Sequence, residues 1–253
     1  MEEGFISAYE TFASVYDLFM EQVEYDEWLD HIHAVWKKYG ITPKTILDLG
    51  CGTGSILLPL AQEGFDVIGV DLSPEMLTEA DHKAMEAGVS VRLACQDMTE
   101  LDLGEQADCI LSLCDCMNYL IEDGQLESAF QSIAAHMKKE SLFLFDMNTE
   151  YKFREVLGQK VFGAAEEAAA YIWENDYDEE EKINEYYVSF FIEQENGLYE
   201  RVEEYHYERA YSIEEIEQAL QAAGMELLEV TDGYSFAKPH EKSERLLFAA
   251  RLK

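Results

Sequence analysis

Short apolar runs alternate with amphipathic stretches through the first 150 residues, and this alternation restricts the possible folds more than any other feature of the sequence. The apolar runs are residues 45–49, 66–71, 91–94, 109–113 and 142–145. Apolar residues at helical spacing predict helices between several of these runs, over residues 55–62, 74–87 and 125–137. Strands that alternate with helices in this way form a parallel sheet with helices on both faces, so the sequence predicts a doubly wound α/β fold.

A different pattern begins after the fifth apolar run. Aromatic and β-branched residues fill three further runs that predict antiparallel strands, residues 170–177, 185–192 and 199–207. The dipeptide Asn196-Gly197 lies between the last two runs and is typical of a hairpin turn. The helix and strand pattern then resumes to the end of the chain. We therefore expect one α/β domain built from residues 1–150 and 211–253, with an inserted antiparallel β lobe at 151–210.

Acidic residues outnumber basic residues by a wide margin. The 253 residues include 53 Asp and Glu against 18 Lys and Arg, which gives a formal net charge of −35. Proteins that bind nucleic acids or anionic membrane surfaces need a basic face, and the sequence contains no cluster of basic residues. The charge instead favours a small-molecule partner, including a cationic or aromatic one.

The sequence also bears on the compartment of the protein. No apolar run approaches the roughly 20 residues that cross a bilayer, and the N-terminus lacks the basic and apolar start of a signal peptide. The five cysteines lie mostly in apolar stretches, which is typical of reduced thiols in the cytoplasm. Cys109, Cys114 and Cys116 lie close together, but no second pair of Cys or His flanks them at a spacing that suits a metal ion. We therefore expect a cytoplasmic protein without a metal site.

The segment LDLGCGTG, residues 47–54, follows the first predicted strand and opens the next helix. It therefore lies at the carboxyl edge of the predicted sheet, where folds of this kind bind ligands. Its three glycines allow the backbone to approach a ligand closely. A dinucleotide fingerprint would have Gly or Ala at Ser55, and Asp48 would repel the pyrophosphate of a dinucleotide. S-adenosylmethionine has no phosphate and carries an ammonium and a sulfonium group, so Asp48 suits that ligand better.

The pattern D-x-G-x-G-x-G at residues 48–54 resembles motif I of the class I S-adenosylmethionine-dependent methyltransferases. The resemblance implies a seven-stranded, mainly parallel sheet in the order 3-2-1-4-5-7-6, with the last two strands antiparallel. It also implies a cofactor site formed by the glycine segment, the ends of the following strands and an N-terminal helix. The implied cofactor residues are Tyr16, Asp48, Gly50, Cys51, Gly52, Gly54, Asp71, Leu72, Asp97, Met98 and Cys114.

The resemblance assigns roles to several of these residues. Asp71 ends the second strand, where a carboxylate can accept hydrogen bonds from both ribose hydroxyls. An acidic residue at the position of Asp97 takes the adenine amino group in the family, and the backbone amide of the next residue, here Met98, faces a ring nitrogen. Leu72 and Met98 are expected to enclose the adenine. The segment that contains Cys114 is expected to line the methionine end of the cofactor.

The N-terminal helix resembles the lid that many members of the family fold over the cofactor. Tyr9, Phe12, Tyr16 and Phe19 fall on one face at helical spacing. A face so apolar must bury against another part of the protein. It either packs permanently on the sheet or closes over the methionine end of the cofactor with the Tyr16 hydroxyl toward the amino acid group.

Methyl transfer from a sulfonium is an in-line displacement, so the protein mainly aligns the reactants and excludes water. A nucleophile that arrives protonated also needs a base. The positions of Asp115, Tyr119, Asp146 and His206 make them candidates for this base. Asp146 could equally cap the segment that follows it. His206 lies in a run where charged and aromatic residues alternate, and a histidine in such a run is more often exposed on the surface of a sheet.

The aromatic residues of the predicted lobe suit either a pocket with cation–π walls or the core of the lobe itself. They include Tyr186, Phe190, Tyr205 and Tyr207. The sequence as a whole predicts an S-adenosylmethionine-dependent methyltransferase that acts on a nitrogen or oxygen nucleophile of a small molecule. The alternatives are a nicotinamide-dependent oxidoreductase and a non-catalytic interaction module of the same fold.

Overall fold

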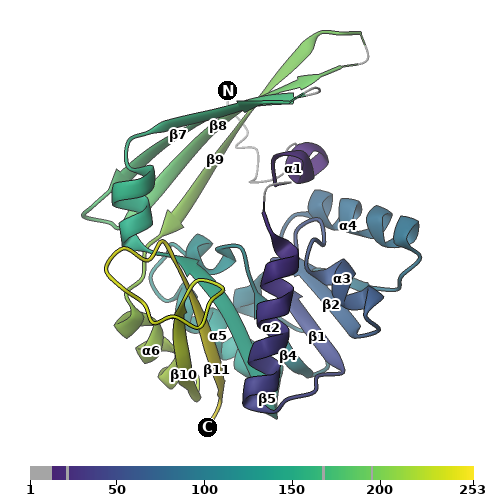
Figure 1. Cartoon of the computed structure of the whole chain (residues 1–253), viewed down its shortest axis with the longest axis vertical. Helices are drawn as coiled ribbons and strands as arrows, with labels where there is room; N and C mark the ends of the chain where they lie inside the picture. Colours follow the sequence, from purple (N-terminus) through teal and green to yellow (C-terminus); the bar gives the residue numbers. More distant parts are fainter. Residues whose placement is uncertain (1–12, 21–22, 167–168, 195) are drawn as a thin grey trace.

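The structure, a computed structural model, describes residues 13–20, 23–166, 169–194 and 196–253 (Figure 1). Sheet A has seven strands in the order β3-β2-β1-β4-β5-β11-β10. These strands are β1 (Thr45–Leu49), β2 (Asp66–Asp71), β3 (Arg92–Cys95), β4 (Ala107–Ser112), β5 (Met137–Asn148), β10 (Met225–Asp232) and β11 (Arg245–Leu252). Strands β1 to β5 pair in parallel, and β11 runs antiparallel to its neighbours β5 and β10. The predicted doubly wound sheet and its strand order are confirmed.

Helices cover both faces of sheet A, which is why its strands are nearly continuous apolar runs. The longer helices are α1 (Ala13–Met20), α2 (Tyr25–Tyr39), α3 (Leu57–Gln62), α4 (Pro74–Ala87), α5 (Gln125–Ala135) and α6 (Ile213–Ala222). Successive residues of a strand point to opposite faces. On β1, Ile46 joins the core formed with α2 and α3, and Leu47 joins the core formed with α5 and α6. None of the helices in the described ranges is long and apolar enough to span a membrane.

Local sequence determines where the helices begin and end. Ser73 Oγ accepts a hydrogen bond from Met76 N at 3.1 Å and Pro74 takes the first helical position, so α4 begins where the sequence predicts. Gly88, with φ of 67°, ends this helix. The predicted helix over 125–137 extends too far, because Met137 already pairs with β4 as the first residue of β5.

The inserted region forms a second sheet, sheet B, of four antiparallel strands. They are β6 (Val161–Ala165), β7 (Ala169–Asp178), β8 (Ile183–Glu193) and β9 (Tyr199–Arg209). The sequence did not predict β6, because small residues replace an apolar run there. Asn118 Nδ2 donates to the carbonyl oxygens of Arg209 and Asn148, at 2.8 and 3.2 Å, and so joins the end of β9 to the end of β5. Figure 1 shows sheet B across this edge of sheet A.

Three short helical segments complete the described part of the chain. They are η1 (Met98–Glu100), η2 (Cys116–Tyr119) and the π-helical η3 (Lys152–Leu157). Segment η1 follows β3, η2 follows β4, and η3 connects β5 with sheet B. All three therefore lie at or near the carboxyl ends of strands of sheet A, which is where a ligand site is expected.

Ser212 is expected to contribute to stability through its cap on α6. Its Oγ accepts a hydrogen bond from Glu215 N at 3.2 Å, and the Glu215 carboxylate accepts one from Ser212 N at 2.8 Å. Ser212→Ala should lower the free energy of unfolding, measured with urea, by about 1 kcal/mol. Glu217→Ala, on the exposed face of the same helix, should change it by less than about 0.5 kcal/mol. Equal stability of the wild type and Ser212→Ala would contradict this account.

Candidate functional site

The glycine segment between β1 and α3 folds back over the end of β2. The backbone amides of Gly50 and Cys51 both donate to Val70 O, at 2.8 and 3.0 Å. Gly50 and Gly52 have φ of 71° and 53°, in the left-handed region that side chains disfavour. A Cβ at Gly50 would lie 2.4 Å from Cys116 Sγ, whereas a Cβ at Gly52 would meet no described atom within 4 Å. Gly52 therefore leaves its backbone open to the space in front of the loop.

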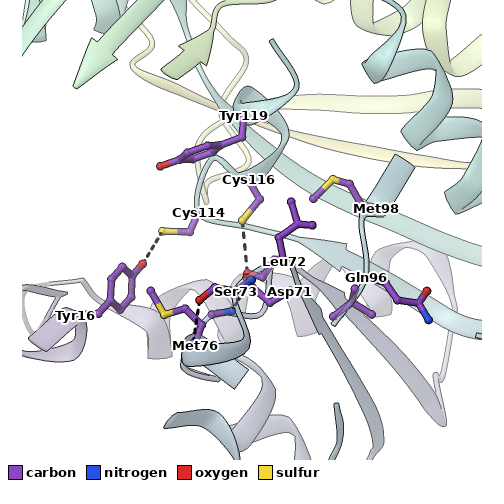
Figure 2. A pocket seen from close by; sticks show the side chains of 13 residues that line it. Tyr16, Asp71, Leu72, Ser73, Met76, Gln96, Met98, Cys114, Cys116 and Tyr119 are labelled. Atoms are coloured by element: carbon purple, nitrogen blue, oxygen red, sulfur yellow. Dashed lines mark hydrogen bonds between the residues drawn. The ribbon is translucent and has the colours of Figure 1, made fainter. Parts of the chain in front are cut away.

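A cavity of about 260 Å³, here called the first cavity, opens in front of this loop (Figure 2). Its lining residues are Tyr16, Gly50, Gly52, Val70, Asp71, Leu72, Ser73, Met76, Gln96, Met98, Cys114, Cys116 and Tyr119. Tyr16 and Cys114 point toward each other on one side of the cavity, and Gln96 and Met98 lie on the other side. The structure thus brings together most of the residues that the sequence assigned to the cofactor.

The carboxylate of Asp71 is held in place by the loops on either side of it. Its Oδ2 accepts a hydrogen bond from Gly52 N at 2.8 Å, and its Oδ1 accepts one from Ser73 N at 2.9 Å. Burial raises the pKa of Asp71, although these backbone amides act in the opposite direction. A carboxylate offers about four acceptor positions, so two amides leave acceptor capacity at the wall of the first cavity.

Asp48 and Cys51 lie behind the glycine loop, around a side cavity of about 40 Å³ that also contacts Tyr16 and Cys114. Asp48 is only 3% exposed, and its Oδ2 accepts no hydrogen bond within the described ranges. Burial, together with the charge of Asp71, raises the pKa of Asp48 to about 7. The structure therefore holds a buried carboxyl group next to the predicted methionine end of the cofactor site without a complete set of partners.

Two of the predicted cofactor residues, Gly54 and Asp97, line neither the first cavity nor the side cavity behind the loop. A Cβ at Gly54 would lie 3.1 Å from Leu58 Cγ, so this glycine allows close packing of the loop on α3. Asp97 is exposed, and its Oδ1 accepts hydrogen bonds from Thr99 N and Thr99 Oγ1 at 2.8 and 2.7 Å. Gln96 and Met98, on either side of Asp97, line the cavity instead. The adenine-binding role of Asp97 stays a prediction.

Helix α1 connects the cofactor loop with sheet B. Asp17 accepts hydrogen bonds from Thr53 Oγ1 at 2.6 Å and from Lys83 Nζ at 2.5 Å. Phe19 packs edge to face on Tyr171 of β7, with ring centroids 4.9 Å apart. The Tyr16 hydroxyl lies 3.9 Å from Cys114 Sγ. Tyr9 and Phe12, which the sequence placed on the same face, lie outside the described residues.

A second cavity of about 280 Å³ lies between sheet B and the carboxyl edge of sheet A. Its lining residues are Tyr16, Met20, Val23, Trp28, Cys114, Asp115, Tyr119, Asn148, Lys152, Leu157, Tyr171, Trp173, Tyr186, Val188, Phe190, His206, Glu208 and Arg245. Tyr16, Cys114 and Tyr119 line both cavities, so the two cavities adjoin at these residues. Of the aromatic residues considered from sequence, Tyr186 and Phe190 line the second cavity, while Tyr205 and Tyr207 are exposed.

Asp146 and Asp115 are bound to each other through an arginine. Asp146 is fully buried and accepts hydrogen bonds from the amides of Cys114 and Asp115, at 3.1 and 2.6 Å, and from Tyr234 OH. Arg245 forms ion pairs of 2.8 Å with both carboxylates. Burial alone would raise the pKa of Asp115, but the charges of Arg245 and Lys152 outweigh it, and the pKa is lowered. Asp146 lines neither cavity. The lowered pKa of Asp115 makes it a weak base, and its two oxygens already accept hydrogen bonds from Arg245 and Asn148, so neither aspartate is well placed to act as a base.

Tyr119 and His206, the other two candidates, lie next to each other. Tyr119 OH is 3.1 Å from His206 Nδ1, and His206 Nε2 is 3.2 Å from Glu204 Oε2. His206 is 6% exposed and Glu204 is 1% exposed. The interpretation of His206 as a surface residue of the sheet is therefore wrong, because the face of β9 that carries it covers the second cavity. The three side chains form a continuous chain from the interior to the junction of the two cavities.

Sequence reasoning missed four polar residues that line the second cavity, Asn148, Lys152, Glu208 and Arg245, and also Glu204, which contacts His206. The alternation of strand residues offers one signal that could have found two of them. Val202 is buried on β9, and Glu204, His206 and Glu208 follow it at every second position. Within the described residues, no group of three or more His, Cys, Asp or Glu side chains is arranged to hold a metal ion.

Known proteins resemble this chain along nearly its whole length. Residues 46–140 match the methyltransferase domain family. The chain is 36% identical to YqeM of Bacillus subtilis (strain 168), described as a methyltransferase, over 96% of each protein. The crystal structure of an S-adenosylmethionine-dependent methyltransferase from Clostridium acetobutylicum ATCC 824 has 35% identity and a TM-score of 0.87, covering 95% of this chain and 97% of that one. This chain belongs to the class I S-adenosylmethionine-dependent methyltransferases.

The first cavity of the methyltransferase fits the cofactor of its family. No lysine or arginine is among the described lining residues, as suits a cationic ligand without phosphate, and Gly52 leaves room for a close approach. The carboxyl groups of Asp71 in the cavity wall and of Asp48 behind the loop are of the type that accepts hydrogen bonds from hydroxyl and ammonium groups. The structure of CalS10 with bound S-adenosylmethionine, an aminopentose methyltransferase from Micromonospora echinaspora, shares the fold at 22% identity and a TM-score of 0.74, covering 94% of this chain and 97% of that one. Family membership thus favours S-adenosylmethionine over a nicotinamide dinucleotide.

Gly52→Val is expected to abolish cofactor binding, because the new side chain would project into the first cavity. Gly64→Val is a matched control, since Gly64 also has a positive φ (95°) and open space at its Cβ but lines neither cavity. Calorimetry with S-adenosylhomocysteine should show at least about a hundredfold weaker binding for Gly52→Val, or about 2.7 kcal/mol. Gly64→Val should bind as the wild type does. Equal affinities of the two variants would contradict the assignment of the glycine loop.

Asp48→Asn should change how stability depends on pH. The folded state holds a proton on Asp48 up to about pH 7, whereas an unfolded Asp releases it near pH 4. The wild type therefore loses stability through this group as pH rises from about 4 to about 7, and the asparagine variant does not. The free energy of unfolding of each protein should be measured with urea from pH 4 to pH 8. The value for Asp48→Asn minus the value for the wild type should increase between about pH 4 and about pH 7. A constant difference would contradict the raised pKa.

Proposed function

We propose that this methyltransferase transfers the methyl group of S-adenosylmethionine to a nitrogen or oxygen nucleophile of a small molecule held in the second cavity. The observation that supports this most is the junction of the two cavities at Tyr16, Cys114 and Tyr119. A cofactor in the first cavity and an acceptor in the second would meet there. Direct contact between them is what an in-line methyl transfer requires.

The residues of the first cavity have distinct roles in this proposal. Gly52 and its neighbours receive the cofactor backbone, Asp71 accepts the ribose hydroxyls, and Leu72 and Met98 enclose the adenine. The ammonium of a bound amino acid group would favour the ionised form of Asp48, which the empty protein keeps protonated up to about pH 7. When bound, S-adenosylmethionine supplies a methyl group activated by its sulfonium. Burial raises the pKa of the Cys114 thiol, so it stays protonated and neutral beside that cationic centre.

The second cavity serves to hold the acceptor and to exclude water. Residues of sheet B form much of its wall, and α1 closes it through Met20 and Tyr16. The inserted region contributes four aromatic side chains to the wall of the second cavity, Tyr171, Trp173, Tyr186 and Phe190. Such walls bury the apolar part of a small molecule, while a few polar groups determine how it is oriented.

We further propose that Tyr119 and His206 receive the proton that the nucleophile loses. With the Glu204 carboxylate holding a proton on Nε2 of His206, the Nδ1 lone pair faces the Tyr119 hydroxyl. Tyr119 then accepts the proton of the nucleophile as it donates its own to His206. Tyr119 is the member of this chain that reaches the junction of the cavities, so it is the proposed catalytic residue, and Glu204 is a positioning residue.

The proposal is tested by incubating the protein with S-adenosylmethionine and a panel of small amines, alcohols and phenols, and measuring the release of S-adenosylhomocysteine. With the substrate so found, His206→Gln should lower kcat by about a hundredfold or more, the scale of general base catalysis. The affinity for S-adenosylhomocysteine should not change. Tyr205→Phe, on the exposed face of the same strand, should retain full activity. Unchanged kcat in His206→Gln would overturn the proposed base.

A further inference from the structure

Glu208 is a buried carboxyl group in the wall of the second cavity, and its hydrogen bonding is incomplete. It lies on the inward face of β9 and is 3% exposed. Its Oε2 accepts a hydrogen bond from Asn148 Nδ2 at 3.1 Å. Within the described residues, its other oxygen accepts none. That oxygen is not sealed off in the protein interior, and Glu208 lines the second cavity, so a ligand there can supply the missing partner.

The cationic side chains near Glu208 are directed to other groups. Arg245 pairs with Asp115 and Asp146, and Lys152 Nζ donates to Asn148 Oδ1 at 2.8 Å. No ion pair joins either cation to Glu208 in the part of the chain that the structure describes. Burial, followed by the charge of Asp115, raises the pKa of Glu208 well above its ordinary value. The Glu208 carboxyl group therefore holds a proton, and has no cationic partner, when the cavity is empty.

Carboxyl groups outnumber lysine and arginine side chains at the second cavity. Within the described ranges, Asp115 and Glu208 line it and Asp146 and Glu204 contact its lining residues, whereas the cationic side chains are Lys152 and Arg245. A neutral ligand would leave the proton on Glu208, whereas a cationic ligand would balance the charge of the ionised Glu208 carboxylate. The formal net charge of −35 also concentrates cations near the protein surface.

The face of sheet B that carries Glu208 also carries aromatic side chains. Tyr186 of β8 pairs with His206, two residues before Glu208 on β9. Tyr171, Trp173 and Phe190 line the second cavity together with Tyr186. The faces of aromatic rings attract ammonium groups and bury the carbon atoms next to them. A carboxyl group and aromatic rings in the wall of one cavity form a site for a protonated amine with an apolar body.

From this arrangement we infer that Glu208 receives a protonated amino group of the methyl acceptor, so that the substrates of this enzyme are small amines with an apolar or aromatic body. The inference rests on the proposed function, because it assigns the second cavity to the acceptor. It adds a specificity-determining residue that is separate from the proposed Tyr119–His206 base. An ammonium group bound at Glu208 makes a charge-assisted hydrogen bond in place of the proton that the empty site holds.

Binding of two small probes tests this inference without knowledge of the natural substrate. Benzylamine and benzyl alcohol have the same ring, but benzylamine carries an ammonium group where benzyl alcohol carries a neutral hydroxyl group. We expect calorimetry on the protein saturated with S-adenosylhomocysteine to show at least tenfold tighter binding of benzylamine. Glu208→Gln, which keeps the size of the side chain, should reduce the preference to less than twofold. Glu203→Gln, on the outward face of the same strand, should retain the preference of the wild type.

The inference is overturned if the wild type has no preference for benzylamine or if Glu208→Gln keeps it. The initial titration with S-adenosylhomocysteine reports on the proposed function separately. If the wild type does not bind S-adenosylhomocysteine, the cofactor assignment is refuted. A preference for benzylamine that is measured without S-adenosylhomocysteine would still support the amine site. Normal S-adenosylhomocysteine binding together with no benzylamine preference would refute the amine site alone.

Discussion

The buried ion pair between Asp146 and Arg245 is the interaction on which the rest of the site depends. Besides pairing with Arg245, the Asp146 carboxylate accepts hydrogen bonds from the amides of Cys114 and Asp115. These two residues have φ of 61° and 59°, a left-handed conformation that is costly for any residue other than glycine. Removing one partner of a buried pair commonly costs about 3–5 kcal/mol. The pair thus holds a strained turn that would otherwise relax.

That turn determines where the two cavities meet. It follows β4, which lies beside β1 at the point where the strand order of sheet A reverses, and a crevice forms at such a point. The turn directs Cys114 into the crevice and starts η2, which carries Tyr119 to the other side of the same junction. Arg245 is the first residue of β11. The last strand of the chain therefore stabilises the turn at Cys114 and Asp115, which lies far earlier in the sequence.

The fold and the cofactor half of the site could be predicted because their signals are local. Apolar runs and capping residues mark the strands and helices of sheet A, and the glycine segment and Asp71 follow directly from the strand ends. Strand β6 could not be found in this way, since three of its five residues are Gly or Ala and none of the five is buried. The burial of His206, which was a candidate base, and the position of Glu208 were not predicted for another reason: the buried face of β9 is polar, and hydropathy alone assigns such a face to solvent. Only the position of sheet B over the second cavity reverses that assignment.

The polar face of β9 also limits how the sequence of this enzyme can change. Residues on this strand point inward at every second position, so the insertion or deletion of a single residue within β9 before Glu204 would turn Glu204, His206 and Glu208 or their pairing partners out of register. Substitution of an inward residue would change the chemistry of the cavity and leave the strand pairing intact. A change in the length of this strand therefore preserves the cavity wall when it adds or removes residues in pairs.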